Sequence, residues 1–177
     1  MNRLFLQSLD VINRVACWIV AVLFAVATCA VLIQVCVRFV LPKLGLIASA
    51  PWTEELARYL VVWCVFIGVG VLCRHAKLIA VEILTIVLPF GKALRIGGMV
   101  LTMAFFVLLV ETGMEWMALS AIELSPVMRI PMTWVAAALP VGSILALLNL
   151  VGFLVASIAN PAEEAADAAE LAELAGD

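Results

Sequence analysis

The stretch VACWIVAVLFAVATCAVLIQVCV occupies residues 15–37 and contains no charged residue. Arg14 precedes it, Arg38 follows it, and Gln34 is its main polar side chain. At about 1.5 Å per residue, a helix of this length crosses the roughly 30 Å hydrocarbon core of a bilayer. A secretory signal peptide would have a shorter apolar region and a small-residue cleavage site. We therefore expect a retained first transmembrane helix here.

The composition of the whole chain agrees with a membrane location. Of the 177 residues, 67% are apolar and 13% are charged, whereas soluble globular domains average about 45–50% apolar and about 25% charged. These values argue against a soluble enzyme domain, and the chain has room for about four spans of roughly 20 residues each. Nucleic acid is not an expected partner, because the sequence shows no cluster of Lys and Arg residues on one face.

Three further apolar segments complete the prediction of an all-α integral membrane protein. The second span begins near Pro51 and Glu54, because proline and carboxylates favour the first turn of a helix. The last span contains Pro140, which membrane helices tolerate. The expected spans cover about residues 15–37, 54–73, 96–118 and 132–159. Together they form one four-span membrane domain over residues 1–160.

Two segments differ from the spans. Residues 78–90 are apolar but too short to cross easily, and Glu82 lies among them. We therefore expect a short interfacial amphipathic helix between the second and third spans. Residues 161–177 carry six carboxylates and no basic residue, which predicts a solvated acidic tail. Basic residues flank the spans six to four in favour of the side that holds both termini, so both termini are expected in the cytoplasm.

No cofactor, metal or catalytic residue is expected. His75 is the one histidine, so a haem held by two histidines is excluded, and no Cys-x-x-Cys-His attachment motif occurs. The five cysteines show no Cys-x-x-Cys spacing, and we interpret them as small packing residues. The sequence also has no Gly-rich phosphate loop, metal-ligand cluster or Ser-His-Asp set.

Glu54, Glu55 and Arg58 form the densest polar cluster, at the start of the second span. Glu54 and Arg58 lie four residues apart on one helix face, with the acid N-terminal, which favours an ion pair. The cluster is therefore either a solvated first turn with a local ion pair or a contact between helices or subunits. Spacing alone leaves both interpretations open.

Glu111 and Glu115 lie one turn apart in the third span. A carboxylate inside a transmembrane segment usually marks a functional site. On that interpretation this pair is a proton relay, as in a small homodimeric proton-coupled multidrug exporter. Alternatively they form an interfacial pair, because a helix carries Glu111 about 24 Å beyond Arg95, close to the far boundary of a roughly 30 Å core. In either case an acid can pair with a basic residue of a partner.

Small residues at four-residue spacing occur in two expected spans. Ala21, Ala25 and Cys29 lie in the first, and Gly142 and Ala146 lie in the fourth. Such spacing lets membrane helices approach closely. Both stripes are therefore weak candidates for helix contacts.

An ordered set of motifs resembles one known family. The set comprises Arg38-Phe39, Trp52-x-Glu54-Glu55-x-x-Arg58, Trp63-x-x-Phe66-x-Gly68, Arg74, Val81-Glu82 and Ser125-x5-Pro131-x8-Pro140-x-Gly142. Over about residues 10–158 it is similar to the small membrane subunit, of the DctQ type, of tripartite ATP-independent periplasmic (TRAP) transporters. The family usually has a His-Ile pair just before Val-Asp, where this chain has Leu78-Ile79 and Val81-Glu82, so no role is carried over for the histidine.

The resemblance implies a division of labour in a bacterial inner membrane. A periplasmic substrate-binding protein captures an organic acid, a large multi-span permease subunit imports it with sodium, and the small subunit braces the large one. Partners would then be these two proteins and membrane lipid. The contact or positioning residues that it implies are Arg38, Trp52, Glu54, Glu55, Arg58 and Trp63. The remaining alternative is an assembly protein of another membrane complex.

Overall fold

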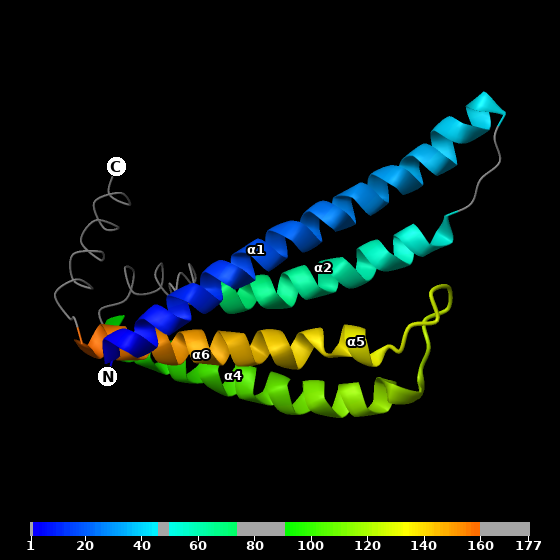
Figure 1. The fold of residues 1–177 in the computed structure, drawn as a ribbon. Helices are drawn as coiled ribbons and strands as arrows, with labels where there is room; N and C mark the ends of the chain where they lie inside the picture. The colour runs from blue at the N-terminus through cyan, green and yellow to red at the C-terminus, as the bar shows by residue number, and fades with distance from the viewer. Residues whose placement is uncertain (1, 46–49, 74–90, 160–177) are drawn as a thin grey trace.

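The computed structural model describes residues 2–45, 50–73 and 91–159. Four helices in this part of the chain are long and apolar enough to cross a membrane (Figure 1). These candidate spans are Gln7–Leu44, Pro51–Leu72, Gly97–Ile122 and Thr133–Val155. The predicted all-α membrane architecture with four spans is thus confirmed. The expected in-plane helix at 78–90, His75 and the acidic tail at 161–177 lie outside the described residues.

The first helix is longer than its apolar run. Helix α1 (Asn2–Val35) continues through a π-helical turn, η1 (Cys36–Val40), and a 3₁₀ turn, η2 (Leu41–Leu44). It ends at Gly45, whose φ of 74° is left-handed, a conformation that glycine adopts without steric cost. The amide of Gly45 donates to the carbonyl of Pro42 at 3.2 Å, which closes the last turn.

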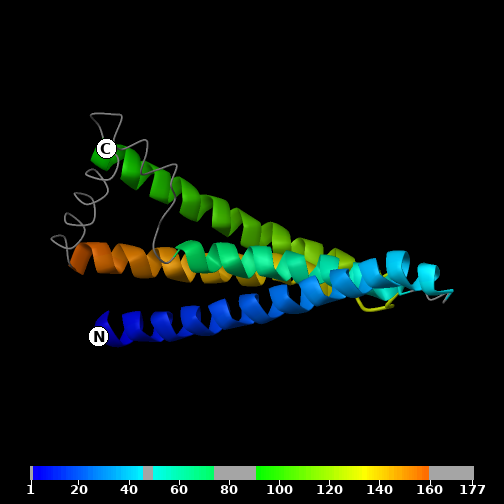
Figure 2. The ribbon, with the colours of Figure 1, turned by 90° about the horizontal axis from the view of Figure 1, so that it is seen from above.

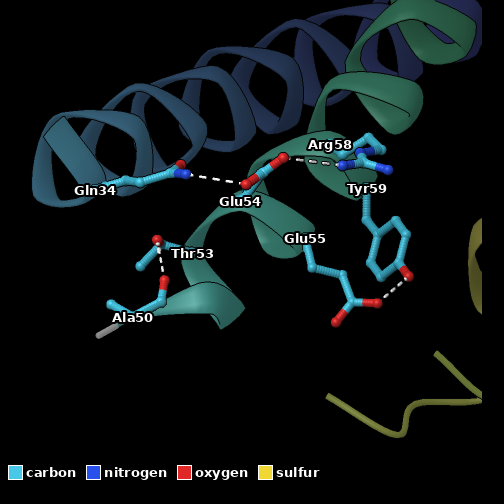
Figure 3. A network of polar contacts seen from close by, with 7 residues as sticks. All are labelled: Gln34, Ala50, Thr53, Glu54, Glu55, Arg58 and Tyr59. Carbon is cyan, nitrogen blue, oxygen red and sulfur yellow. Dashed lines mark hydrogen bonds and ion pairs between the residues drawn. The ribbon is translucent and has the colours of Figure 1, made fainter. Parts of the chain in front are cut away.

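Helix α2 (Pro51–Leu72) begins where proline fixes the first helical φ. The fully buried Thr53 donates its hydroxyl to the carbonyl of Ala50 at 2.7 Å (Figure 3). This bond ties the entering chain to the first turn, so the orientation of that turn is fixed. Helix α4 (Gly91–Leu119) forms the third span and continues into the 3₁₀ turn η4 (Ser120–Ile122).

The fourth span is interrupted near its start. Helix α5 (Thr133–Ala136) is separated from α6 (Ala138–Ala159) at Ala137. Pro140 has no amide proton to donate to the carbonyl four residues earlier, and its ring crowds that position. The α-helical pattern resumes when Val141 donates to the carbonyl of Ala137 at 3.2 Å. The predicted tolerance of proline therefore comes with a local break.

Residues 123–132 form a tight hairpin between η4 and α5, hereafter the 123–132 hairpin. Leu124 and Pro131 form an isolated antiparallel bridge. Inside it, the amide of Ser125 donates to the carbonyl of Ile130 at 2.9 Å. Arg129 adopts a φ of 53°, a left-handed conformation that is uncommon for a residue with a side chain.

The long helices pack in a row. Helix α1 packs on α2, α2 on α6, and α6 on α4. Figures 1 and 2 show α1 and α4 on opposite sides of the central pair, α2 and α6. Helices α1 and α4 are therefore the two edges of the row. A small core of Cys73, Phe106, Ala146 and Leu150 lies among α2, α4 and α6.

One of the two small-residue stripes makes the expected contact. A Cβ on Gly142 would lie 2.5 Å from the backbone oxygen of Phe66, so α2 and α6 touch backbone to backbone there. The other stripe, from Ala21 to Cys29, faces outward. Helix α1 instead buries Ala27 and Ala30. The first stripe therefore makes no helix contact within the described part of this chain, because its spacing fits the helix period equally well on either face.

Candidate functional site

The start of α2 sends its two adjacent carboxylates in different directions. Consecutive residues on an α-helix are separated by about 100°. Figure 3 shows Glu54 pointing toward α1 and Arg58, whereas Glu55 points away toward Tyr59 and the hairpin. The cluster that the sequence suggested is therefore two separate contacts.

The first contact, around Glu54, lies on the surface. Glu54 accepts a hydrogen bond from Gln34 of α1 at 3.1 Å and an ion pair from Arg58 at 3.2 Å. The side chains of Arg58 and Glu54 are 70% and 58% exposed. Ion pairs this exposed contribute about 0–1 kcal/mol to stability. Because both side chains are exposed, another chain can reach them.

The second contact, around Glu55, is buried. Only 8% of Glu55 is exposed, and its carboxylate accepts bonds from the backbone amides of Met128 at 2.8 Å and Val127 at 3.2 Å. The Tyr59 hydroxyl donates at 2.6 Å, and the hydroxyl of Ser125 donates as well. A buried charge is stable only when it is paired or hydrogen-bonded, and here two elements supply the donors.

Glu55 thus acts as the anchor of the 123–132 hairpin on α2. Ser125 is 2% exposed, whereas the side chain of Val127, whose amide also bonds to Glu55, stays exposed. Every donor to Glu55 is a hydroxyl or an amide of its own turn or of the hairpin. The arrangement suits positioning of the hairpin against α2.

The other sequence-predicted residues occupy separate places. Trp63 donates its indole N–H to the carbonyl of Trp134 at 3.2 Å, which holds α5 against α2. Trp52 is exposed on α2, and the Arg38 guanidinium lies 5.9 Å from the ring centroid of its neighbour Phe39. The structure does not bring Arg38 or Trp52 into the Glu55 network.

Glu111 and Glu115 are both exposed on α4. Within the described residues, no hydrogen bond or ion pair is found for either carboxylate. In the candidate span Gly97–Ile122, Glu111 lies about 21 Å from the first residue and about 17 Å from the last.

A third polar contact was not anticipated. Asn13 and Asn149 exchange hydrogen bonds of 2.7 and 2.8 Å between their amide groups, and Asn149 also donates to the carbonyl of Gly70 at 2.8 Å. Asn149 is fully buried, so α1, α2 and α6 meet there. An asparagine inside an apolar span is a recognised signal for a helix contact, and it would have located this one.

A hollow of about 620 Å³ opens between α2 and α4. It exists because α4 packs on α6 and α5 instead of closing against α2. The lining includes Val62 and Phe66 of α2 and Trp116 and Leu119 of α4. Within the described residues, no group of three or more His, Cys, Asp or Glu side chains is placed to hold a metal ion.

Comparison with known families gives a match over most of the chain. The family model described as "Tripartite ATP-independent periplasmic transporters, DctQ component" matches residues 27–160. This range includes the Glu55 anchor, the 123–132 hairpin and α4. A comparison with curated proteins found no match. The chain belongs to the DctQ family and is a small permease component of a TRAP transporter.

Proposed function

We propose that this chain braces the large permease subunit of a sodium-coupled, binding-protein-dependent importer of organic acids. The observation that carries this proposal is the open row of helices. Its buried polar groups, Asn13, Asn149 and Glu55, bond to one another or to backbone and hydroxyl groups. In the described part of the chain these groups are committed to structure, which suits a frame more than a path for solute.

A transport domain that moves through the bilayer needs a fixed frame to move against. A row of helices extends such a frame sideways by more than a closed bundle of the same four helices would. The row also leaves both edge helices largely uncovered, since α1 and α4 are the least buried spans. Edge surfaces of this kind are available to lipid or to a partner subunit.

The proposed orientation places both termini in the cytoplasm of a bacterial inner membrane. The bias of basic residues toward the terminal side supports it. The start of α2 and the 123–132 hairpin lie at the opposite end of the row (Figure 1). In this orientation they face the periplasm, where a substrate-binding protein would approach.

The predicted contact residues then divide into two roles. Glu55 and Trp63 position the hairpin and α5, because their bonds run to those segments. Arg38, Trp52, Glu54 and Arg58 are exposed and available to a partner. We expect Glu54→Ala or Arg58→Ala to weaken assembly or uptake. Unchanged assembly and uptake in both variants would remove the proposed role of this surface.

Reconstitution tests the function directly. The chain is co-expressed with the large permease and purified by its own tag in mild detergent. The two proteins should co-purify in stoichiometric amounts. Proteoliposomes that contain both should take up an organic acid only with a sodium gradient and the binding protein. A homodimer without the permease, or cation efflux by this chain alone, would instead support the proton-coupled exporter.

A further inference from the structure

We propose that the α4 edge of the row, and not the α1 edge, docks against a transmembrane helix of the large permease subunit. That helix presents a basic side chain to Glu111 and Glu115. The inference rests on the proposed function, because it takes the large permease as the partner. It goes further by assigning the face of this chain that is used and the chemistry that the partner must supply.

The α4 edge is one continuous face of the helix. Its exposed residues recur at spacings of three, four and seven, which keeps them on one side of an α-helix. They include Leu101, Leu108, Glu111 and Glu115. The face is therefore an apolar stripe with two carboxylates set into it, and within the described structure no other element covers it.

Lipid is a poor neighbour for this face. Glu111 lies well inside the candidate span, and Glu115 follows one turn later. An ionised or unpaired carboxyl group facing hydrocarbon is costly, and such groups in membrane helices almost always face protein or water. A partner helix that carries a cation removes this cost by pairing.

The α1 edge gives the opposite picture. Its apolar run over residues 15–37 has no charged residue. The large side chains that it exposes, such as Trp18, Val22 and Phe24, are apolar. This edge can lie against lipid without leaving a charge unpaired. The two edges therefore differ in what they require, and only the α4 edge requires a polar partner.

The surface beside the α4 edge is shaped to receive side chains. The hollow between α2 and α4 is lined on the α4 side by Trp116 and Leu119. Leu119 lies four residues after Glu115 and therefore on the same face of α4, so the hollow borders the acidic face. A partner helix lying along α4 can place an apolar side chain in the hollow while its basic residue meets the carboxylates.

A second copy of this chain fits the same face badly. Two copies related by a two-fold axis along the membrane normal bring identical patches together. Glu111 would then approach Glu111 of the second copy, and like charges brought together at an interface oppose association. Charge complementarity therefore favours a partner of different sequence with basic groups at this depth.

Photo-crosslinking in the complete complex tests the choice of edge. A benzoylphenylalanine probe replaces Leu108 on the α4 edge or Phe24 on the α1 edge, which are matched at 60% and 62% exposed. The complex is purified before irradiation, so loss of the permease at that stage would overturn the proposed function and this inference with it.

With the permease present, the Leu108 probe should form an adduct with the permease and the Phe24 probe should form adducts with lipid. A permease adduct from Phe24 alone would overturn the inference. So would a Leu108 probe that reacts only with lipid or with a second copy of this chain.

Charge variants test the pairing. Glu111→Lys should lower recovery of the permease about tenfold, which corresponds to about 1.4 kcal/mol, and Glu111→Gln should lower it less. Asp10→Lys is the control, because Asp10 is exposed on α1, at the other edge of the row. Circular dichroism verifies that each variant keeps its helices. Normal recovery with Glu111→Lys would refute the carboxylate–cation contact.

Discussion

Replacing Glu55 by alanine removes four hydrogen bonds from the contact between α2 and the 123–132 hairpin. The lost donors are the hydroxyls of Tyr59 and Ser125 and the amides of Val127 and Met128. A hydrogen bond to a charged group contributes about 1.5–3 kcal/mol, and a buried donor left without a partner costs about 1–3 kcal/mol.

The four terms do not simply add. The hairpin tip is exposed and its amides can bond to water, whereas Ser125 is 2% exposed and cannot. We therefore expect Glu55→Ala to lower the free energy of unfolding by about 3–5 kcal/mol. Glu55→Gln should cost about 1–2 kcal/mol, because its carbonyl still accepts and hydroxyl partners can turn to accept from its amide.

Glu54→Ala is the matched control, one residue away on the same turn. Its ion pair is exposed, so the expected loss is about 0–1 kcal/mol. Denaturant unfolding in detergent, followed by circular dichroism, compares the variants. Hydrogen exchange should also show the amides of Val127 and Met128 exchanging about 100-fold faster in Glu55→Ala, which corresponds to about 2.8 kcal/mol. Equal losses at positions 54 and 55, or unchanged exchange in the hairpin, would refute the anchor.

Three other sets of substitutions test the packing and the backbone conformation. Asn149→Leu should destabilise the chain by about 1–3 kcal/mol, because the side-chain oxygen of Asn13 loses its donor. The double variant with Asn13→Leu should recover part of that loss in a double-mutant cycle. Gly142→Ala should cost about 1–3 kcal/mol through overpacking of the α2–α6 contact, whereas Gly68→Ala, whose Cβ would meet nothing within 4 Å, should leave unfolding unchanged or slightly stabilised. Arg129→Gly should be neutral or stabilising and Arg129→Val destabilising by about 1–3 kcal/mol, because the backbone there has a positive φ; equal melting temperatures for the last two variants would contradict that reasoning.

The number of helices long enough to span a membrane could be predicted from the sequence, whereas the extension of α1 beyond its apolar run could not. A single apolar run such as residues 15–37 crosses a bilayer as an α-helix, because its backbone groups must form their hydrogen bonds within the segment. Arg38 and Lys43 follow the apolar run, yet a helix can continue past such residues. Helix α1 does so through η1 and η2 until Gly45 stops it.

The polar contacts were only partly predictable. The Glu54–Arg58 pair follows from spacing along one helix, and it forms as expected. The contact between Glu55 and Ser125 cannot be predicted from spacing, because Ser125 lies 70 residues later. Only tertiary packing brings the hairpin back to α2. The resemblance did include both Glu55 and Ser125 among its motif positions, but motif order carries no information about contact.

The contact between Asn13 and Asn149 has a consequence for how the chain is made. The two residues are 136 positions apart, and one lies at the start of the first span while the other lies in the last. At about 5–20 residues per second, synthesis takes about 7–27 s to pass from one to the other.

During that interval Asn13 has entered the membrane region without the side chain that satisfies it. Helix α2 can already pack on α1, but the acceptor and donor groups of Asn149 do not yet exist. The amide of Asn13 bonds back to the carbonyl of Leu9 at 3.0 Å, and this local bond is available as soon as the first turns form. The polar contact at the start of the first helix is therefore completed only when α6 arrives, after α1 has already packed on α2.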